Sequence, residues 1–119
     1  MAEGWTRTLK NDDFEAFSAG TAPHGVDPLA VAVMSEAGVD ISRQKSTHVD
    51  EYRSMFFDYV VTVCDNAREN CPYFPAKVKI MHKSFNDPPV LAKNASTKEE
   101  ALTHYRRVRD EIKKYVEKL

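Results

Sequence analysis

A β-branched run, "DYVVTVC", ends at Cys64 and constrains the fold of this chain more than any other segment. Such residues favour an extended strand, and a run without regular polar alternation is typical of a strand buried in a parallel sheet. Parallel strands are joined by long crossovers, most often helices. The run therefore predicts an α/β fold.

Helix signals lie on both sides of this strand. Asp27 is expected to cap a helix that starts at Pro28 and stops at Gly38. Residues 1–10 have helix-forming composition, and Thr47 is expected to cap a short helix before the strand.

A long amphipathic helix is predicted at the end of the sequence. Ser96 and Glu99 match a capping box. Apolar residues then recur at helical spacing: Ala101, Tyr105, Val108, Ile112, Tyr115 and Leu119.

Two further strands are expected, at residues 14–20 ("FEAFSAG") and 77–81 ("KVKIM"). The alternation of helices and strands predicts a single domain over residues 1–119, a doubly wound parallel α/β sheet. Ligand sites of such sheets lie beyond the carboxyl ends of the strands. The loop after Ser18, the segment from Cys64 and residues 82–89 are expected to meet there.

The bulk composition restricts the partners of the chain. With 17 basic and 18 acidic residues among 119, the net charge is −1, which argues against binding nucleic acid or anionic membranes by charge. The longest apolar run, residues 29–34, is too short for a membrane span. We expect a soluble cytoplasmic protein with neither a nucleic acid nor a membrane as partner.

The chain has two cysteines, Cys64 and Cys71. If they lay on one helix, a rise of about 1.5 Å per residue would separate them by roughly 10 Å, whereas a disulfide needs Cα atoms about 4.4–6.8 Å apart. Closing the pair would then unwind the segment and make it a redox switch. The alternative is that both thiols are packing residues. A zinc site with His82 lacks the usual ligand spacing.

Several segments together resemble the thioredoxin-coupled arsenate reductases, which have the low-molecular-weight protein tyrosine phosphatase fold. They are "MAEGW", "SAGTAPHGVDPLAVAVMSEAGVDIS", "FDYVVTVCDNARENCP", "DPP" and "RVRDEIKKYVEKL". The resemblance covers essentially the whole chain, and its most specific part is the C-x6-C pair followed by proline.

The resemblance implies catalytic roles for Cys64, Cys71 and Asp87. Cys64 would attack the arsenic adduct of a first cysteine and release arsenite, and Cys71 would then attack Cys64 and leave a disulfide for thioredoxin to reduce. Asp87 would protonate the leaving oxygen. Without the resemblance, Asp87 and Pro88 read as an ordinary turn.

The family's phosphate loop, C-x5-R, does not occur in these 119 residues. Arg68 follows Cys64 too closely, and Lys77 stands where arginine would follow Cys71. The family's first, central strand is absent as well. We expect a truncated fold that is not catalytically competent alone, because nothing supplies the first thiolate or the oxyanion donors. The flanking strands could pair directly, exchange elements in a strand-swapped homodimer, or leave residues 1–20 poorly ordered.

Some family members bind potassium, and the matching positions here include Glu3 and Ser18. Thr47 stands where a carboxylate ligand is found in those members, and another ligand lies in the missing loop. We therefore expect no bound metal or cofactor, and Lys45 is a candidate for the positive charge instead.

Three functions stay open at this point. The first is an arsenate reductase for arsenic detoxification, converting arsenate to arsenite in a longer form of the chain. The second is a non-enzymatic dithiol module that responds to redox state or binds arsenite. The third, phosphatase activity on phosphotyrosine, needs the same missing nucleophile.

Overall fold

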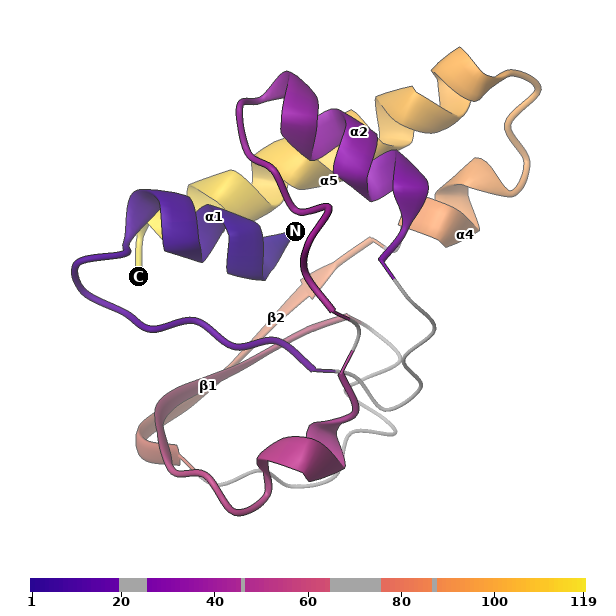
Figure 1. Cartoon of the computed structure of the whole chain (residues 1–119). Helices are drawn as coiled ribbons and strands as arrows, with labels where there is room; N and C mark the ends of the chain where they lie inside the picture. Colours follow the sequence, from indigo (N-terminus) through magenta and orange to yellow (C-terminus); the bar gives the residue numbers. More distant parts are fainter. Residues whose placement is uncertain (20–25, 46, 65–75, 87) are drawn as a thin grey trace.

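The computed structural model describes residues 1–19, 26–45, 47–64, 76–86 and 88–119. The helices are α1 (Ala2–Leu9), α2 (Pro28–Glu36), the 3-10 helix η1 (Val49–Tyr52), α4 (Pro88–Ala92) and α5 (Lys98–Glu117), and the strands are β1 (Phe57–Cys64) and β2 (Ala76–Phe85) (Figure 1). The predicted α/β class is confirmed.

The two strands form a parallel ladder, as the β-branched run predicts. Tyr59 pairs with Lys79 and Thr62 with His82, and an irregularity then brings Cys64 opposite Phe85. The strand β2 continues to Phe85, beyond the predicted range of 77–81. The prediction of a buried β1 is wrong in part, because 44% of the Tyr59 surface is exposed.

The predicted strand at residues 14–20 is wrong for the part that the structure describes. Residues 14–19 belong to no strand, and among the described residues the sheet contains β1 and β2 alone. Aromatic side chains instead contact β1: the rings of Phe14 and Tyr59 lie 5.7 Å apart, and those of Phe17 and Phe57 lie 5.5 Å apart. A segment becomes a strand only when a neighbour completes its ladder, and β1 does not pair directly with residues 14–19.

The core lies in the helical layer, around α5. Figure 1 shows α1 and α2 along α5, with α4 near its N-terminal end, and the three helices contact it. The Trp5 indole is buried and donates a hydrogen bond from Nε1 to the Arg109 carbonyl at 3.1 Å. The remaining core is mainly aliphatic: Val33, Met34, Val39, Ile41, Leu102, Val108, Ile112 and Val116.

The helix α1 lies very close to the segment after α2. A Cβ added to Gly4 would stand 2.7 Å from Ile41 Cγ2 and 3.3 Å from Met34 Cε. Glycine is therefore required here by space. Gly38, which follows α2, is required by conformation, since its φ is 83°.

The caps differ in detail from the predictions. Asp27 caps α2 as predicted, accepting a hydrogen bond from Leu29 N at 2.9 Å. The cap of α5 is Thr97 rather than Ser96, because Thr97 Oγ1 accepts from Glu100 N at 3.1 Å. The cap of η1 is His48 rather than Thr47. The short helix α4 is an element that the sequence analysis does not predict.

Candidate functional site

The carboxyl ends of β1 and β2 come together as the sequence analysis predicts. Thr62 Oγ1 and His82 Nδ1 form a hydrogen bond between the strands. Two residues further along β1 the strand ends at Cys64, whose backbone is in register with Phe85 at the end of β2. The helix α4 begins shortly afterwards, at Pro88.

The structure places one of the three predicted catalytic residues. Cys64 is the last residue of β1, and its backbone position is the part that the structure describes. Cys71 and Asp87 lie outside the described residues, as does most of the loop after Ser18. The roles of these residues stay predictions.

Glu3 and Ser18, the two residues matched to a cation site, do contact each other. Ser18 Oγ donates a hydrogen bond to Glu3 Oε1. Arg7 Nε donates to Glu3 Oε2 at 2.9 Å, and its Nη2 donates to the Ala16 carbonyl at 2.8 Å. Arg7 thus places a positive charge beside the Glu3 carboxylate, and the role suggested for Lys45 stays a prediction.

The sequence analysis missed Arg7, although its spacing from Glu3 is the i,i+4 spacing of helical ion pairs. The carboxylate that it balances is mostly covered, with 12% of the Glu3 side chain exposed. Among the described residues, no three His, Cys, Asp or Glu side chains gather as metal ligands.

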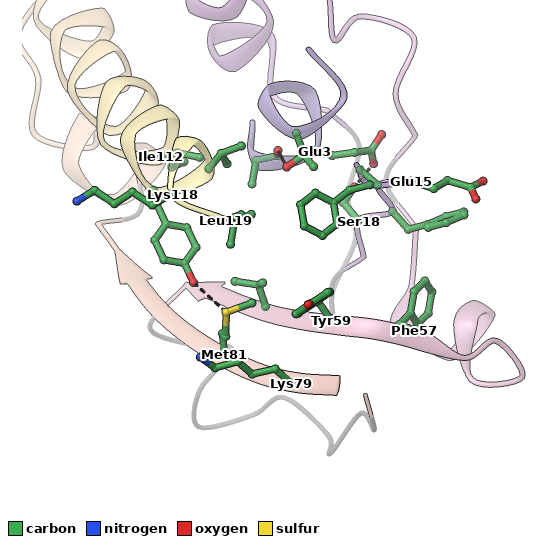
Figure 2. A pocket seen from close by; sticks show the side chains of 18 of the residues that line it. Glu3, Glu15, Ser18, Phe57, Tyr59, Lys79, Met81, Ile112, Lys118 and Leu119 are labelled. Carbon is green, nitrogen blue, oxygen red and sulfur yellow. Dashed lines mark hydrogen bonds between the residues drawn. The ribbon is translucent and has the colours of Figure 1, made fainter. Parts of the chain in front are cut away.

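A cavity of about 580 Å³ separates the sheet from the helical layer beside residues 14–19. In Figure 2 the side chains of Phe57 and Tyr59 rise from β1 on one side, and Ile112 of α5 and Leu119, which follows α5, lie on the other. Most of the lining is apolar, and charges occur at Glu3, Glu15, Lys79 and Lys118. We call this cavity the trough.

An ion-pair network joins α2 to α5 away from the strand ends. Arg106 binds Glu36 at 2.9 Å and Glu99 at 2.6 Å. Its hydrogen bond holds the pKa of Glu36 below the ordinary value, and the two carboxylates raise the pKa of Arg106. This network links α2 to α5 and places no side chain at the ends of β1 and β2.

In the parts of the chain described here, no helix is both long and apolar enough to cross a bilayer.

The fold and the arrangement at the strand ends define a class of protein. Residues 1–119 match the family described as low molecular weight phosphotyrosine protein phosphatase. The chain belongs to this family.

Within the family, the chain is similar to several curated proteins described as arsenate reductases. The chain is 43% identical over 116 residues to an arsenate reductase of Halalkalibacterium halodurans, covering 98% of this chain and 81% of that protein. It is 43% identical over 112 residues to the arsenate reductase of Bacillus subtilis, covering 94% of this chain and 78% of the relative.

Solved structures give the same result. A structure described as an arsenate reductase in oxidized state superposes with a TM-score of 0.79 and 28% identity, covering 99% of this chain and 83% of that one. A structure described as an arsenate reductase in reduced state superposes with a TM-score of 0.72 and 28% identity. The match covers 98% of this chain and 82% of that one. The arsenate reductase fold is thus shared over nearly the whole chain.

Proposed function

We propose that this chain takes part in arsenate reduction by supplying a dithiol that thioredoxin can reduce. Cys64 and Cys71 are the two exchanging thiols. The observation that carries the proposal is the 43% identity to arsenate reductases over 116 residues. The position of Cys64 at the carboxyl end of a parallel strand, where α/β folds place reacting groups, supports it. Neighbours described as oxidized and reduced support a redox role.

In the proposed reaction, the Cys64 thiolate attacks the sulfur of a thiol that carries arsenic(V). A disulfide forms, the sulfur–arsenic bond breaks, and the electron pair leaves with arsenic as arsenite. The Cys71 thiolate then attacks the sulfur of Cys64 and expels the first thiol as a thiolate. Thioredoxin reduces the resulting Cys64–Cys71 disulfide. Asp87 acts earlier, when the first thiolate attacks arsenate: it protonates the arsenate oxygen that the sulfur displaces, and this oxygen leaves as water.

The thiol that carries arsenic lies outside these residues in this proposal. No C-x5-R pattern occurs among the 119 residues, and oxyanion chemistry needs both a thiolate and convergent donors. We therefore propose that the 119-residue chain alone does not turn over arsenate, and the same reason argues against phosphatase activity.

The dithiol is tested by oxidising the purified chain with diamide and measuring its mass. An internal disulfide removes two hydrogens, and thioredoxin, thioredoxin reductase and NADPH should then consume one NADPH per chain. Cys71→Ser should show neither change, and Cys64→Ser should behave in the same way. A wild-type chain that forms no reducible internal disulfide would contradict the proposal.

Turnover is tested with arsenate, the same reducing system and the Bacillus subtilis relative as positive control. We expect at least a 100-fold lower rate for the 119-residue chain. A rate near that of the relative would refute the proposed dependence on an outside thiol while leaving the dithiol role standing.

A further inference from the structure

A side-chain hydrogen bond joins β1 to β2 two residues before the end of β1. Its partners are Thr62 Oγ1 and His82 Nδ1, and the two residues are also in register in the parallel ladder. Because they lie 20 residues apart in the sequence, this bond is a tertiary contact that orients the imidazole. His82 is exposed, so its ring can exchange protons with water.

The Thr62–His82 pair faces away from the helical layer. Val61 and Met81, which directly precede the two residues of the pair, line the trough. Successive side chains of a strand point to opposite faces, so the pair lies on the other face of the sheet. Figure 1 shows α1, α2 and α5 together on one side of the two strands. The pair is therefore separate from the trough.

The ladder is irregular directly after this pair. Thr62 lies opposite His82 and Cys64 opposite Phe85, so two steps along β1 correspond to three steps along β2. An extra residue in one strand bends that strand and redirects the side chains beside it, and such irregularities are frequent next to active sites. Here the irregularity falls between the imidazole and the residue that carries the proposed nucleophilic thiol.

The spacing along β1 brings a proton acceptor close to Cys64. This residue lies two positions beyond Thr62, which at about 3.3 Å per residue is roughly 7 Å along the strand. A thiol must lose its proton before its sulfur can attack. Histidine is the side chain that takes up and releases protons near neutral pH.

We propose that His82 is the base that takes the proton from the Cys64 thiol, directly or through one water, and that Thr62 positions its imidazole. The inference rests on the dithiol role of Cys64 proposed above. In this role Nδ1–H donates to Thr62 Oγ1, and Nε2 of the neutral ring is the proton acceptor.

The proton returns to sulfur at the end of the cycle. In the forward step the sulfur–hydrogen bond of Cys64 breaks, a nitrogen–hydrogen bond forms on His82, and the electron pair stays on sulfur as a thiolate. When thioredoxin reduces the Cys64–Cys71 disulfide, Cys64 departs as a thiolate, and the imidazolium gives it back the proton.

The charged groups around His82 can be assigned to each neighbouring element. Among the described elements, β1 and α5 pack against β2, and α5 contacts Met81 on the opposite face. On β1, Asp58 alternates to the same face but lies four residues before Thr62, or about 13 Å, beyond the Debye length of about 8 Å. Lys83 follows His82 on β2 and is kept in every variant below, so its field is common to all comparisons.

The first test uses the Cys71→Ser chain, in which Cys64 is the only thiol. Its rate of alkylation by iodoacetamide, followed by mass against pH, reports the thiolate. Adding His82→Gln, which cannot take up the proton, should slow alkylation at pH 7 at least fivefold. At pH 10, above the ordinary pKa of a thiol, the two rates should agree within twofold. An unchanged rate at pH 7 would overturn the proposal.

Matched variants at position 62 test the positioning role. In the same Cys71→Ser chain, Thr62→Val keeps the shape of the side chain but removes the hydroxyl, and should slow alkylation at pH 7 at least twofold. Thr62→Ser keeps the hydroxyl and should stay near the parent rate. Once His82→Gln is present, Thr62→Val should have no further effect. Equal slowing by valine and serine would contradict the proposal.

Two controls exclude a general effect of the substitutions. His104→Gln removes an imidazole from α5 and should leave the alkylation rate within twofold of the parent. Thermal unfolding followed by circular dichroism shows which variants keep the fold, and should His82→Gln not fold, the comparison of valine and serine at position 62 decides.

The dithiol assay separates this inference from the proposed function. With Cys71 restored, diamide should still form the internal disulfide in His82→Gln, because both thiols are present, and thioredoxin should reduce it more slowly at pH 7. A wild-type chain without a reducible disulfide would refute the proposed function. A reducible disulfide together with an alkylation profile that His82→Gln leaves unchanged would refute the role of His82 alone.

Discussion

The helical layer and the sheet of this molecule differ sharply in how completely they are buried. Met34 and Val33 in α2 have 0% exposed surface and Val108 in α5 has 1%. In the sheet, by contrast, Val78 is 63% exposed and Ile80 48%. Phe85 is the one residue of β1 or β2 in the buried core cluster among the described residues. The comparison teaches that the helices around α5 bury one another, whereas the sheet depends on further cover.

The largest difference in stability is expected when one apolar side chain is removed from each region. Met34→Ala should cost about 2–5 kcal/mol, because it leaves a cavity in a fully buried site. Ile80→Ala should cost about 1 kcal/mol or less, since half of the side chain is already in water. Urea unfolding measures both, with Met34→Leu as the volume-conserving control. Similar losses for the two alanine variants would break the comparison.

Gly4 tests the closest contact within the helical layer. Gly4→Ala should destabilise the chain by about 1–3 kcal/mol, although alanine is the better helix former, because its Cβ would stand 2.7 Å from Ile41 Cγ2. Ile41→Leu removes this branch, so alanine at position 4 should cost less in that background. The measurement is a double-mutant cycle by urea unfolding, and a strictly additive cycle would contradict the steric explanation.

A smaller effect distinguishes the two hydroxyls before α5. Thr97→Ala should lose about 1 kcal/mol, because its Oγ1 accepts the hydrogen bond from Glu100 N. Ser96→Ala should lose little, since the interaction described for Ser96 is the one its backbone N makes with Glu100 Oε2. Thermal unfolding of both variants measures the difference, and the reverse order would restore the cap predicted from the sequence.

The smallest expected effect concerns the ion pair between α2 and α5. Arg106 lowers the pKa of Glu36, so the contribution of this carboxylate to stability is present at neutral pH and is lost as the pH falls through its lowered pKa. Glu36→Gln should lower Tm by about 2 °C or less at pH 7 and by less at pH 3. An effect that grows as the pH falls would contradict this sign.

The sequence predicts best those elements whose signals are local. Asp27 before Pro28 specifies the start of α2, and the β-branched run specifies β1 and its parallel partner. Residues 14–20 show why alternation is insufficient: the pattern favours a strand, but strand formation also needs a neighbouring ladder. The structure provides none for residues 14–19.

At the start of α5 the sequence is compatible with two N-cap residues. Ser96 and Thr97 each have a glutamate three residues later, so two registers of the same capping box fit the sequence. Packing of the helix then decides between them.

For the candidate site, the sequence predicts that three segments meet at the strand ends. The Thr62–His82 hydrogen bond and the register of Cys64 with Phe85 confirm this for β1 and β2, and the loop after Ser18 lies mostly outside the described residues. The sequence analysis also pairs Glu3 with Ser18, but through the family resemblance rather than through a local pattern. The role of Arg7 is not evident from the sequence. An exposed ion pair and an ion pair that neutralises a covered carboxylate have the same i,i+4 spacing. Burial, which distinguishes them, is a tertiary property.

The position of α5 in the chain has a consequence for biosynthesis. Trp5, Val33 and Met34 all pack in a cluster that α5 completes, yet residues 98–117 are translated after both of the helices they cover. From the end of α2 at Glu36 to the end of α5 at Glu117, the ribosome needs roughly 4 to 16 s at about 5–20 residues per second. During that interval α1 and α2 lack the helix against which they pack, so their apolar side chains stay exposed on the nascent polypeptide, which is the kind of surface that chaperones bind.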